Sequence, residues 1–299
     1  MAKLIIVGKG PAGISAALYT ARAKIPTLII GRDGGALAKT DRIENYYGFA
    51  EPVSGTELLE AGIANAKRLG AEILEDEVVG ISWDEQFTVR TKSGSYIADA
   101  VLLATGAARS APAIPGLKEY EGRGVSYCAV CDAFFYREKE VAVLGSGEYA
   151  LHEALELVHT ARRVTLLTNG EKLSAALPEQ IHLGTRPLTR LTGEDVLTGA
   201  EFQTGDPLAF AGLFVAVGVA SSSDLAKKLG ASVEQNRIVA QPDGSTDLPG
   251  LFAAGDCRGG LLQIAKAVSE GALAGTAAIQ YIRKLPISVG NAEGQMAFF

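Results

Sequence analysis

Cysteine and histidine are scarce in this sequence, with three of each among 299 residues. A small secreted scaffold held by disulfides needs a larger and even number of cysteines, so that class of protein is excluded. A structural zinc ion needs four ligands. His152, His159 and His182 show no ligand spacing, so we predict no metal site. So low a cysteine count is typical of a protein from a reducing compartment.

Long apolar runs and an excess of positive charge are also absent. No apolar stretch reaches the roughly 18 residues that a membrane span needs, so no membrane association is predicted. Arginine and lysine number 28 against 34 acidic residues, a net charge of −6 that disfavours nucleic acid as a ligand. The chain passes directly from Met1-Ala2-Lys3 into an apolar strand pattern, without the features of a signal peptide, and we expect it to be cytoplasmic.

A glycine-rich signature follows the first predicted strand. The strand is Leu4–Val7, the signature is Gly8-Lys9-Gly10-Pro11-Ala12-Gly13, and a helix pattern runs from Ile14 to Ala23. In a dinucleotide-binding unit the first glycine forms the tight turn, the second lets the backbone approach a pyrophosphate, and the third lets helix pack on strand. The next strand is Thr27–Ile30, and Asp33 is a displaced candidate for the ribose-binding acid that usually ends it. This order favours dinucleotide binding over an ordinary glycine-rich turn.

The residues after this unit predict a long loop and a further nucleotide-facing strand. The segments 34–37 and 43–48 have little periodicity, and long loops in compact α/β domains are usually functional. A helix is predicted from about Gly55 to Leu69. The stretch 101–106 is a buried strand that ends in small residues, which lets its backbone lie against a flat ligand. Short strands are predicted over Glu72–Leu74, Val79–Trp83, Phe87–Thr91 and Tyr96–Ala98.

The same signature occurs a second time. Strand Val141–Leu144 precedes Gly145-Ser146-Gly147-Glu148-Tyr149-Ala150, a helix pattern runs from Leu151 to about His159, and strand Val164–Leu167 follows. An acid after that last strand would favour NADH and an arginine cluster would favour NADPH. The segment Thr168–Lys172 offers neither feature. Arg162 and Arg163 precede the strand, at the wrong end, and are predicted to be solvated.

The last third of the chain returns to the first unit. Residues 173–212 are predicted to be loop-rich, and 213–218 to form a closing strand. Residues 251–256 repeat the small-residue strand ending, and a long helix is predicted from Leu261 to about Arg283. With 47% hydrophobic residues, the composition suits an α/β protein. We predict two Rossmann-like three-layer nucleotide-binding domains, the second inserted in the first, with residues 1–111 and 241–299 forming one and residues 112–240 the other.

Between the two signatures lies Cys128-Ala129-Val130-Cys131-Asp132. A single C-x-x-C is a redox pair, half of a zinc site or an inert buried pair. Its place between two nucleotide-binding units favours a redox pair, in which Cys128 and Cys131 are catalytic and Asp132 moves a proton to or from the thiolate. Asp132 also suits a plain helix cap. Cys257 is predicted to be a buried thiol.

Together these motifs resemble the low-molecular-weight bacterial thioredoxin reductases over nearly the whole chain. The matching segments are the first glycine motif, the E-N-Y-x-G loop at 44–48, the A-T-G strand end at 104–106, the C-x-x-C-D motif and the A-G-D motif at 254–256. The resemblance implies the FAD/NAD(P)-binding disulfide reductase fold, FAD as cofactor, thioredoxin as partner and a homodimer. The predicted cofactor-binding residues are Gly8, Gly10, Pro11, Ala12, Gly13, Asp33, Ala36, Leu37, Asn45, Ala104, Thr105, Gly106, Gly255, Asp256, Gln263, Ile264 and Phe299.

The resemblance also implies an electron route from FAD to the cysteine pair and on to thioredoxin by thiol–disulfide exchange. It implies that Cys131 is nearer the flavin and that Cys128 attacks the partner; the residues alone do not assign these roles. The family's histidine-arginine-arginine run is absent, and Thr168-Asn169-Gly170 stands in its place. In lacking this run, the chain looks more like the branch of the family that uses reduced ferredoxin. Reduced ferredoxin is therefore our preferred electron donor, and NADPH or NADH is the alternative.

Two further readings stay open. In the ferredoxin-dependent branch an aromatic tail would cover the flavin, and Phe298-Phe299 suits this role or ordinary packing. The alternative from another functional class is that the protein is a flavin-bound redox sensor that catalyses no turnover. Because ferredoxin is acidic, its docking needs basic residues. The candidates are Arg186, Arg190, Lys227 and Lys228.

Overall fold

The computed structural model describes residues 3–107 and 112–286. Its first sheet is five-stranded and parallel, in the order β18-β7-β1-β2-β3. The strands are β1 (Leu4–Val7), β2 (Thr27–Ile30), β3 (Glu72–Leu74), β7 (Ala100–Leu103) and β18 (Leu251–Ala253). Strand β18 pairs with β7 from about 150 residues further along the chain, with Val101 opposite Leu251. The sheet is therefore completed only when the chain returns from a second unit.

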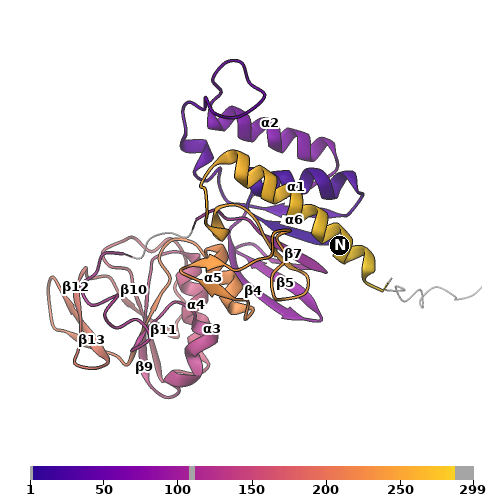
Figure 1. Ribbon diagram of the computed structural model, residues 1–299. Coiled ribbons are helices and arrows are strands. Elements are labelled where there is room, and N and C mark those ends of the chain that lie inside the picture. Colours follow the sequence, from indigo (N-terminus) through magenta and orange to yellow (C-terminus); the bar gives the residue numbers. More distant parts are fainter. Residues whose placement is uncertain (1–2, 108–111, 287–299) are drawn as a thin grey trace, which may run out of the picture.

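Helices cover one face of this sheet and an antiparallel sheet covers the other. The helices α1 (Pro11–Arg22), α2 (Gly55–Arg68) and α6 (Ile264–Lys284) lie together on one side (Figure 1). A Cβ on Gly271 of α6 would lie 2.1 Å from the carbonyl oxygen of Ala12, so glycine is what lets α6 pack against the start of α1. The opposite layer is β4 (Val78–Asp84), β5 (Gln86–Thr91) and β6 (Ser95–Ala98). Alternate residues of β1 enter the two cores, as in any sheet buried on both faces.

The second unit repeats this plan. Its parallel sheet has the order β11-β10-β9-β15-β8. The strands are β8 (Val125–Ser126), β9 (Glu140–Leu144), β10 (Arg163–Leu167), β11 (Ile181–Gly184) and β15 (Gly212–Val215). Helix α4 (Glu148–Val158) packs on one face, and the antiparallel strands β12 (Leu188–Gly193), β13 (Leu197–Phe202) and β14 (Leu208–Ala209) on the other. The predicted fold class, two three-layer α/β units, is confirmed.

Several short elements connect these layers. They include the 3₁₀ turns η1 (Leu37–Lys39), η2 (Ala133–Tyr136) and η3 (Asp256–Arg258), the helices α3 (Ala129–Asp132) and α5 (Ser222–Lys228), and the hairpin β16 (Val233–Glu234) and β17 (Arg237–Ile238). The two units meet where α4 packs on β4. A Cβ on Gly80 would lie 2.3 Å from Nε2 of His152. Ion pairs join Arg90 to Glu156 at 3.4 Å and Lys92 to Glu148 at 3.2 Å.

Some predicted elements differ from the observed ones. Residues 173–212 are not loop-rich, because β11 to β14 lie within them. The sequence pattern for these strands is weak because register shifts at Leu188/Arg190 and Thr192/Gly193 break the alternation of buried and exposed residues. Helices α1 and α4 begin about three residues earlier than predicted, since each starts directly after a glycine N-cap, Gly10 or Gly147.

The connections between the sheets agree with one unit inserted in the other. The chain leaves the first sheet after β7 and returns to it at β18. We propose the domain boundaries 1–111, 112–240 and 241–299; the first boundary, and the tail residues Phe298 and Phe299, lie outside the described residues. None of the helices in the described part of the chain is both long and apolar enough to cross a membrane.

Candidate active site

The first glycine motif forms a tight turn at the carboxyl end of β1. Gly8 has a φ of +115°, and a Cβ there would lie 2.3 Å from the carbonyl oxygen of Ala104 at the end of β7. A Cβ on Gly13 would lie 1.9 Å from the carbonyl oxygen of Gly8. A Cβ on Gly10, by contrast, would meet no atom within 4 Å. The first and third glycines are therefore required by packing, and the second faces open space.

This open space lies at the N-terminus of α1. Gly10 caps the helix without a side chain, and the first turn contains no acid. Free backbone N–H groups and the helix dipole at such an end suit a phosphate group. Gly255, with a φ of +85°, brings the A-G-D motif against the same helix, since a Cβ there would lie 2.9 Å from Cβ of Ala12. The structure thus brings together Gly8–Gly13, Ala104 and Gly255 as predicted cofactor residues.

Asp256 begins η3 beside this turn. Burial raises the pKa of its carboxyl group, Lys266 opposes this, and Glu270 adds to it. A carboxyl group with such a raised pKa is suited to hydrogen bonding with a hydroxyl-bearing ligand. Asp33 follows β2 at the same carboxyl edge of the parallel sheet, and its carboxylate accepts hydrogen bonds from Arg32 at 2.8 Å and from the backbone N–H of Gly35 at 2.9 Å. Its assignment to a ribose stays a prediction.

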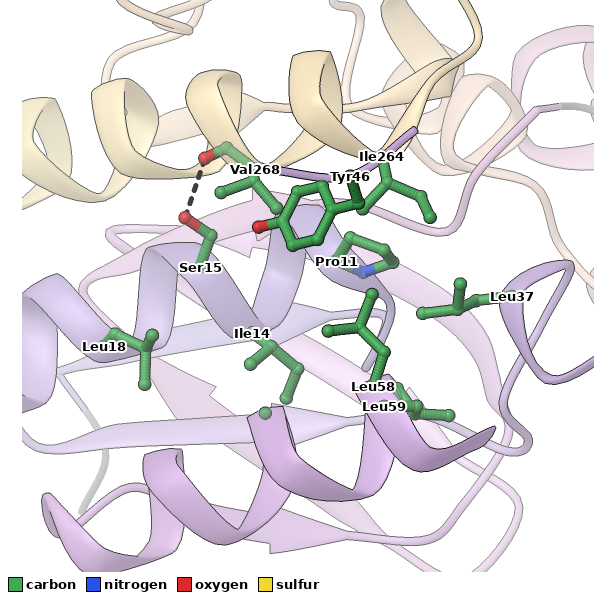
Figure 2. A pocket seen from close by; sticks show the side chains of 11 residues that line it. Pro11, Ile14, Ser15, Leu18, Leu37, Tyr46, Leu58, Leu59, Ile264 and Val268 are labelled. Atoms are coloured by element: carbon green, nitrogen blue, oxygen red, sulfur yellow. Dashed lines mark hydrogen bonds between the residues drawn. The ribbon is translucent and has the colours of Figure 1, made fainter. Parts of the chain in front are cut away.

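Asn45 and Gln263 meet across the top of α6. The amide of Asn45 donates to Oε1 of Gln263 at 3.0 Å, which ties the 34–50 loop to the start of the helix. Beneath this joint is an apolar cavity of about 120 Å³ between α1, α2 and α6 (Figure 2). It is smaller than the 300 Å³ or more typical of ligand pockets. Pro11, Leu37 and Ile264 line it, so their side chains pack the joint that carries Asn45 and Gln263.

Thr105, in the 104–106 segment at the end of β7, connects the first unit to the second. Its backbone N–H donates to Oγ of Ser222 at 3.1 Å, and the N–H of Ser222 donates to Oγ1 of Thr105 at 2.8 Å. Ser222 is fully buried at the start of α5. The sequence reasoning missed Ser222, although Ser221 and Asp224 form a capping box that signals a helix start here.

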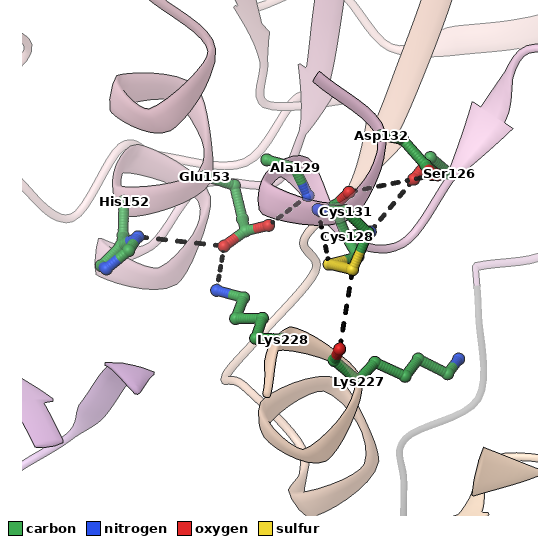
Figure 3. Close-up of a disulfide and its surroundings, with 9 residues drawn as sticks. All are labelled: Ser126, Cys128, Ala129, Cys131, Asp132, His152, Glu153, Lys227 and Lys228. Carbon is green, nitrogen blue, oxygen red and sulfur yellow. Dashed lines mark hydrogen bonds and ion pairs between the residues drawn. A yellow bond between two sulfur atoms is a disulfide. The ribbon is translucent and has the colours of Figure 1, made fainter. Parts of the chain in front are cut away.

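The cysteine pair is closed as a disulfide. Cys128 and Cys131 have Cα atoms 5.3 Å apart, and Cys128 is the N-cap of α3 (Figure 3). The N–H of Cys131 donates to Sγ of Cys128 at 3.2 Å. Cys128 is only 5% exposed, whereas Cys131 is exposed and its Sγ lies 3.7 Å from the carbonyl oxygen of Lys227. In this conformation Cys131 is the more exposed of the two cysteines.

Asp132 is linked to Cys128 through one serine. The hydroxyl of Ser126 donates to Oδ2 of Asp132 at 2.6 Å, and the N–H of Cys128 donates to Oγ of Ser126 at 3.1 Å (Figure 3). Asp132 stands at the N-cap position of η2, but its side chain makes no capping bond there, and α3 is capped by Cys128. A carboxylate so close to the redox pair fits a proton-transfer role, which stays a prediction.

The surface beside the disulfide is apolar and exposed. Val130, Phe134 and Phe135 are 51%, 70% and 68% exposed, although large side chains of this kind are normally buried. They flank Cys131 in the chain. An exposed apolar group next to a redox disulfide fits contact with another protein rather than with a small thiol.

Burial decides the role of two other residues that the sequence singled out, Lys228 and Cys257. Lys228 cannot serve as a docking residue for an acidic protein, because its side chain is 1% exposed and pairs with Glu153. Cys257 is a buried free thiol, as predicted, and burial raises its pKa to about 11. Residues 3–107 and 112–286 contain no cluster of three or more His, Cys, Asp or Glu side chains arranged to hold a metal ion.

Comparisons with known proteins agree on one family. Residues 2–271 match the family described as pyridine nucleotide-disulphide oxidoreductase. The thioredoxin reductase of Listeria monocytogenes is 35% identical over 305 residues, covering 96% of this chain and 95% of that protein. The atypical thioredoxin reductase TRi from Desulfovibrio vulgaris Hildenborough is 44% identical, with a TM-score of 0.90, covering 95% of this chain and 98% of that one.

A ferredoxin-flavin thioredoxin reductase from Clostridium acetobutylicum is also similar. It is 29% identical, with a TM-score of 0.69, covering 94% of this chain and 98% of that one. The similarity to all of these proteins spans both sheets and the cysteine pair rather than one nucleotide-binding unit alone. The chain therefore belongs to the thioredoxin reductase family of pyridine nucleotide-disulphide oxidoreductases, whose cofactor is FAD.

Proposed function

We propose that this FAD-dependent oxidoreductase reduces the disulfide of thioredoxin and takes its electrons from reduced ferredoxin. Once reduced to its dithiol form, the Cys128–Cys131 pair, with exposed apolar residues beside it, reduces the partner disulfide and returns to the disulfide. The residues that would hold FAD are the Gly8–Gly13 turn, Asn45, the 104–106 strand end and Asp256. When bound there, FAD supplies the link between a one-electron donor and a two-electron disulfide, because a flavin exchanges electrons singly or in pairs.

The choice of electron donor depends on whether the second glycine motif can still bind a nucleotide. Its fold is kept, because a Cβ on Gly145 would lie 2.3 Å from the carbonyl oxygen of Ala216, matching the contact of Gly8 with Ala104. However, Glu148 occupies the first turn of α4, and its carboxylate is 3.2 Å from Lys92. A pyrophosphate would need this helix end, and an acid there repels it.

The rest of the second motif supports the same conclusion. Both the N–H and the hydroxyl of Ser174 donate to the carbonyl oxygen of Ser146, at 3.0 and 3.1 Å, so the following segment folds back onto the glycine turn. After β10, Thr168 is buried and Oδ1 of Asn169 accepts from the N–H of Leu188 at 2.6 Å. The segment 168–172 directly after this strand contains no arginine to hold a 2′-phosphate, and Arg162, at the other end of the strand, pairs with Glu140.

The named relatives support two candidates. The similarity to a protein described as a ferredoxin-flavin thioredoxin reductase favours ferredoxin. The family description, and curated relatives such as that of Listeria monocytogenes, favour a pyridine nucleotide, which is our second candidate. Because the family resembled is usually dimeric, we also propose a homodimer, which light scattering of the purified protein tests.

The donor is tested by mixing the FAD-loaded protein anaerobically with reduced ferredoxin, NADPH or NADH. We expect the flavin absorbance to bleach at least about a hundredfold faster with ferredoxin, a difference of ~2.7 kcal/mol in activation free energy. Loss of thioredoxin disulfide over many turnovers should follow, which excludes a redox sensor that turns nothing over. Fast bleaching by NADPH or NADH, with none by ferredoxin, contradicts the proposal.

The apolar residues beside the disulfide lead to a second prediction. Replacing Phe134 and Phe135 together with serine should raise the KM for thioredoxin about tenfold, because a protein partner loses buried apolar contact area. Reduction of a small aromatic disulfide should be unchanged. Trp83→Ser is the matched control, since Trp83 is an aromatic side chain that is 61% exposed on β4 of the first unit, outside the segment that carries the disulfide. An unchanged KM in the double variant would remove this surface from the proposal.

A further inference from the structure

A buried ion pair lies behind the redox disulfide. Glu153 of α4 is 2% exposed, and the side chain of Lys228 at the end of α5 is 1% exposed. The ammonium group of Lys228 bonds Oε1 of Glu153 and lies 5.2 Å from the ring centre of Tyr149. Neither charged residue was singled out from the sequence as a partner of the cysteines, although Glu153 stands on the apolar face of α4. Burying a charged pair is costly, so it needs a physical reason.

The pair contacts both ends of the redox segment. Oε2 of Glu153 accepts a hydrogen bond of 2.9 Å from the N–H of Ala129, the residue that follows Cys128 (Figure 3). On the other side, the carbonyl group of Lys227, directly before Lys228, lies 3.7 Å from Sγ of Cys131. The two helices that carry the pair, α4 and α5, therefore hold the disulfide between them.

Two titratable side chains that lie against the pair, His152 and Tyr149, are neutral. His152 lies 3.8 Å from Glu153, but burial, Lys228 and Arg90 lower its pKa to about 4, so it is neutral. Burial raises the pKa of Tyr149 well above its usual value, which keeps it neutral too. The other charged groups that face the pair are Arg90, Glu156, Asp224 and, across the disulfide, Asp132.

Lys228 favours the ionised form of Glu153. Burial raises the pKa of the Glu153 carboxyl, and Lys228 and the N–H of Ala129 oppose that rise. Removal of Lys228 would therefore leave either an uncompensated negative charge or a protonated acid beside the cysteines. Each of those states alters the field at the two sulfur atoms, since interactions in a buried site are poorly screened.

We propose that the Glu153–Lys228 pair is a positioning pair that sets the redox potential of the Cys128–Cys131 dithiol. Reduction breaks the S–S bond, takes up two electrons and one proton, and leaves one thiolate and one thiol. The new negative charge is stabilised by Lys228 and destabilised by Glu153. The proposal rests on the disulfide chemistry of the family and is independent of the electron donor.

The test is the equilibrium of the full-length, FAD-loaded protein with dithiothreitol, with the dithiol fraction measured by alkylation and mass spectrometry. Lys228→Met should lower the equilibrium constant for reduction about tenfold, or ~30 mV. Glu153→Gln, which keeps an acceptor for Ala129, should raise it about tenfold. The double variant, in which no charge is left unpaired, should return to within about threefold of wild type.

Two controls separate this role from simple packing. Lys228→Arg keeps the charge and should keep the potential. Lys227→Met removes a charge from the same helix, but that ammonium group contacts Asn236 and Tyr127, and the potential should not move. If Lys228→Met does not fold, the near-isosteric Glu153→Gln decides the question. Shifts of the two single variants in the same direction, or no shift in Glu153→Gln, would overturn the proposal.

Discussion

Replacing Cys128 with serine should reduce thioredoxin turnover to less than about a thousandth of the wild-type rate, as for other removed nucleophiles. A serine hydroxyl forms neither a disulfide with Cys131 nor a mixed disulfide with a partner, so exchange has no sulfur to proceed through. Bound FAD should remain reducible, because Cys128 lies in the second unit, where its N–H bonds Ser126, and not in the glycine turn. Thioredoxin disulfide is followed under steady-state conditions, and flavin absorbance is followed in parallel.

Two comparisons make this result specific. Cys257→Ser should leave turnover unchanged, because that thiol is buried and its pKa is raised to about 11. Cys131→Ser should trap thioredoxin in a stable mixed disulfide if Cys128 is the attacking thiol. Trapping by Cys128→Ser instead would assign the attack to Cys131, the more exposed cysteine in this conformation. Turnover above a tenth of wild type in Cys128→Ser would remove the dithiol from the mechanism.

Replacing Gly10 with valine should remove FAD without unfolding the protein. A side chain at Gly10 would meet no protein atom within 4 Å, but it would fill the space at the N-terminus of α1 that suits the pyrophosphate. We expect FAD affinity to fall at least about a hundredfold, or ~2.7 kcal/mol. Gel-filtered protein should be colourless, with its circular dichroism and its apoprotein melting temperature unchanged.

The neighbouring glycine gives the contrast. Gly8→Ala should lose both FAD and stability, because its φ is +115° and the added Cβ would lie 2.3 Å from the carbonyl oxygen of Ala104. Gly94→Ala, in the turn between β5 and β6 with no atom closer than 4.0 Å, is the control and should keep FAD. Retention of wild-type FAD affinity by Gly10→Val would show that the dinucleotide does not use this turn.

The nucleotide-binding units were predictable because their signals are local. In both, a short apolar strand, a glycine turn and a helix follow one another within about twenty residues, and the first glycine of each turn, Gly8 or Gly145, has a steric reason to be there. The cysteine pair was predictable for the same reason, since two residues three apart close a disulfide without help from the rest of the chain. The resemblance to a family then added FAD, which spacing alone does not name.

Contacts between distant elements were not predictable in this way. Glu153 and Lys228 are 75 residues apart, and Thr105 and Ser222 are 117 apart. In the sequence Lys228 looks like an ordinary surface lysine at the end of a helix, and its burial depends on how α5 packs against α4. Strands β12 to β14 were missed because bulges break their alternation, so their pairing depends on the sheet that they cover.

Local pattern was thus enough to predict the two glycine turns, the cysteine pair and the strand ends that we assign to a cofactor site, since each depends on neighbours in the chain. Only the tertiary structure decided which residues lie behind the disulfide. It also decided whether the N-terminus of α4 is open to a nucleotide. The charge on Glu148 or Lys228 has no meaning for the site until packing decides which residue lies opposite it, and this pairing joins segments that the sequence keeps far apart.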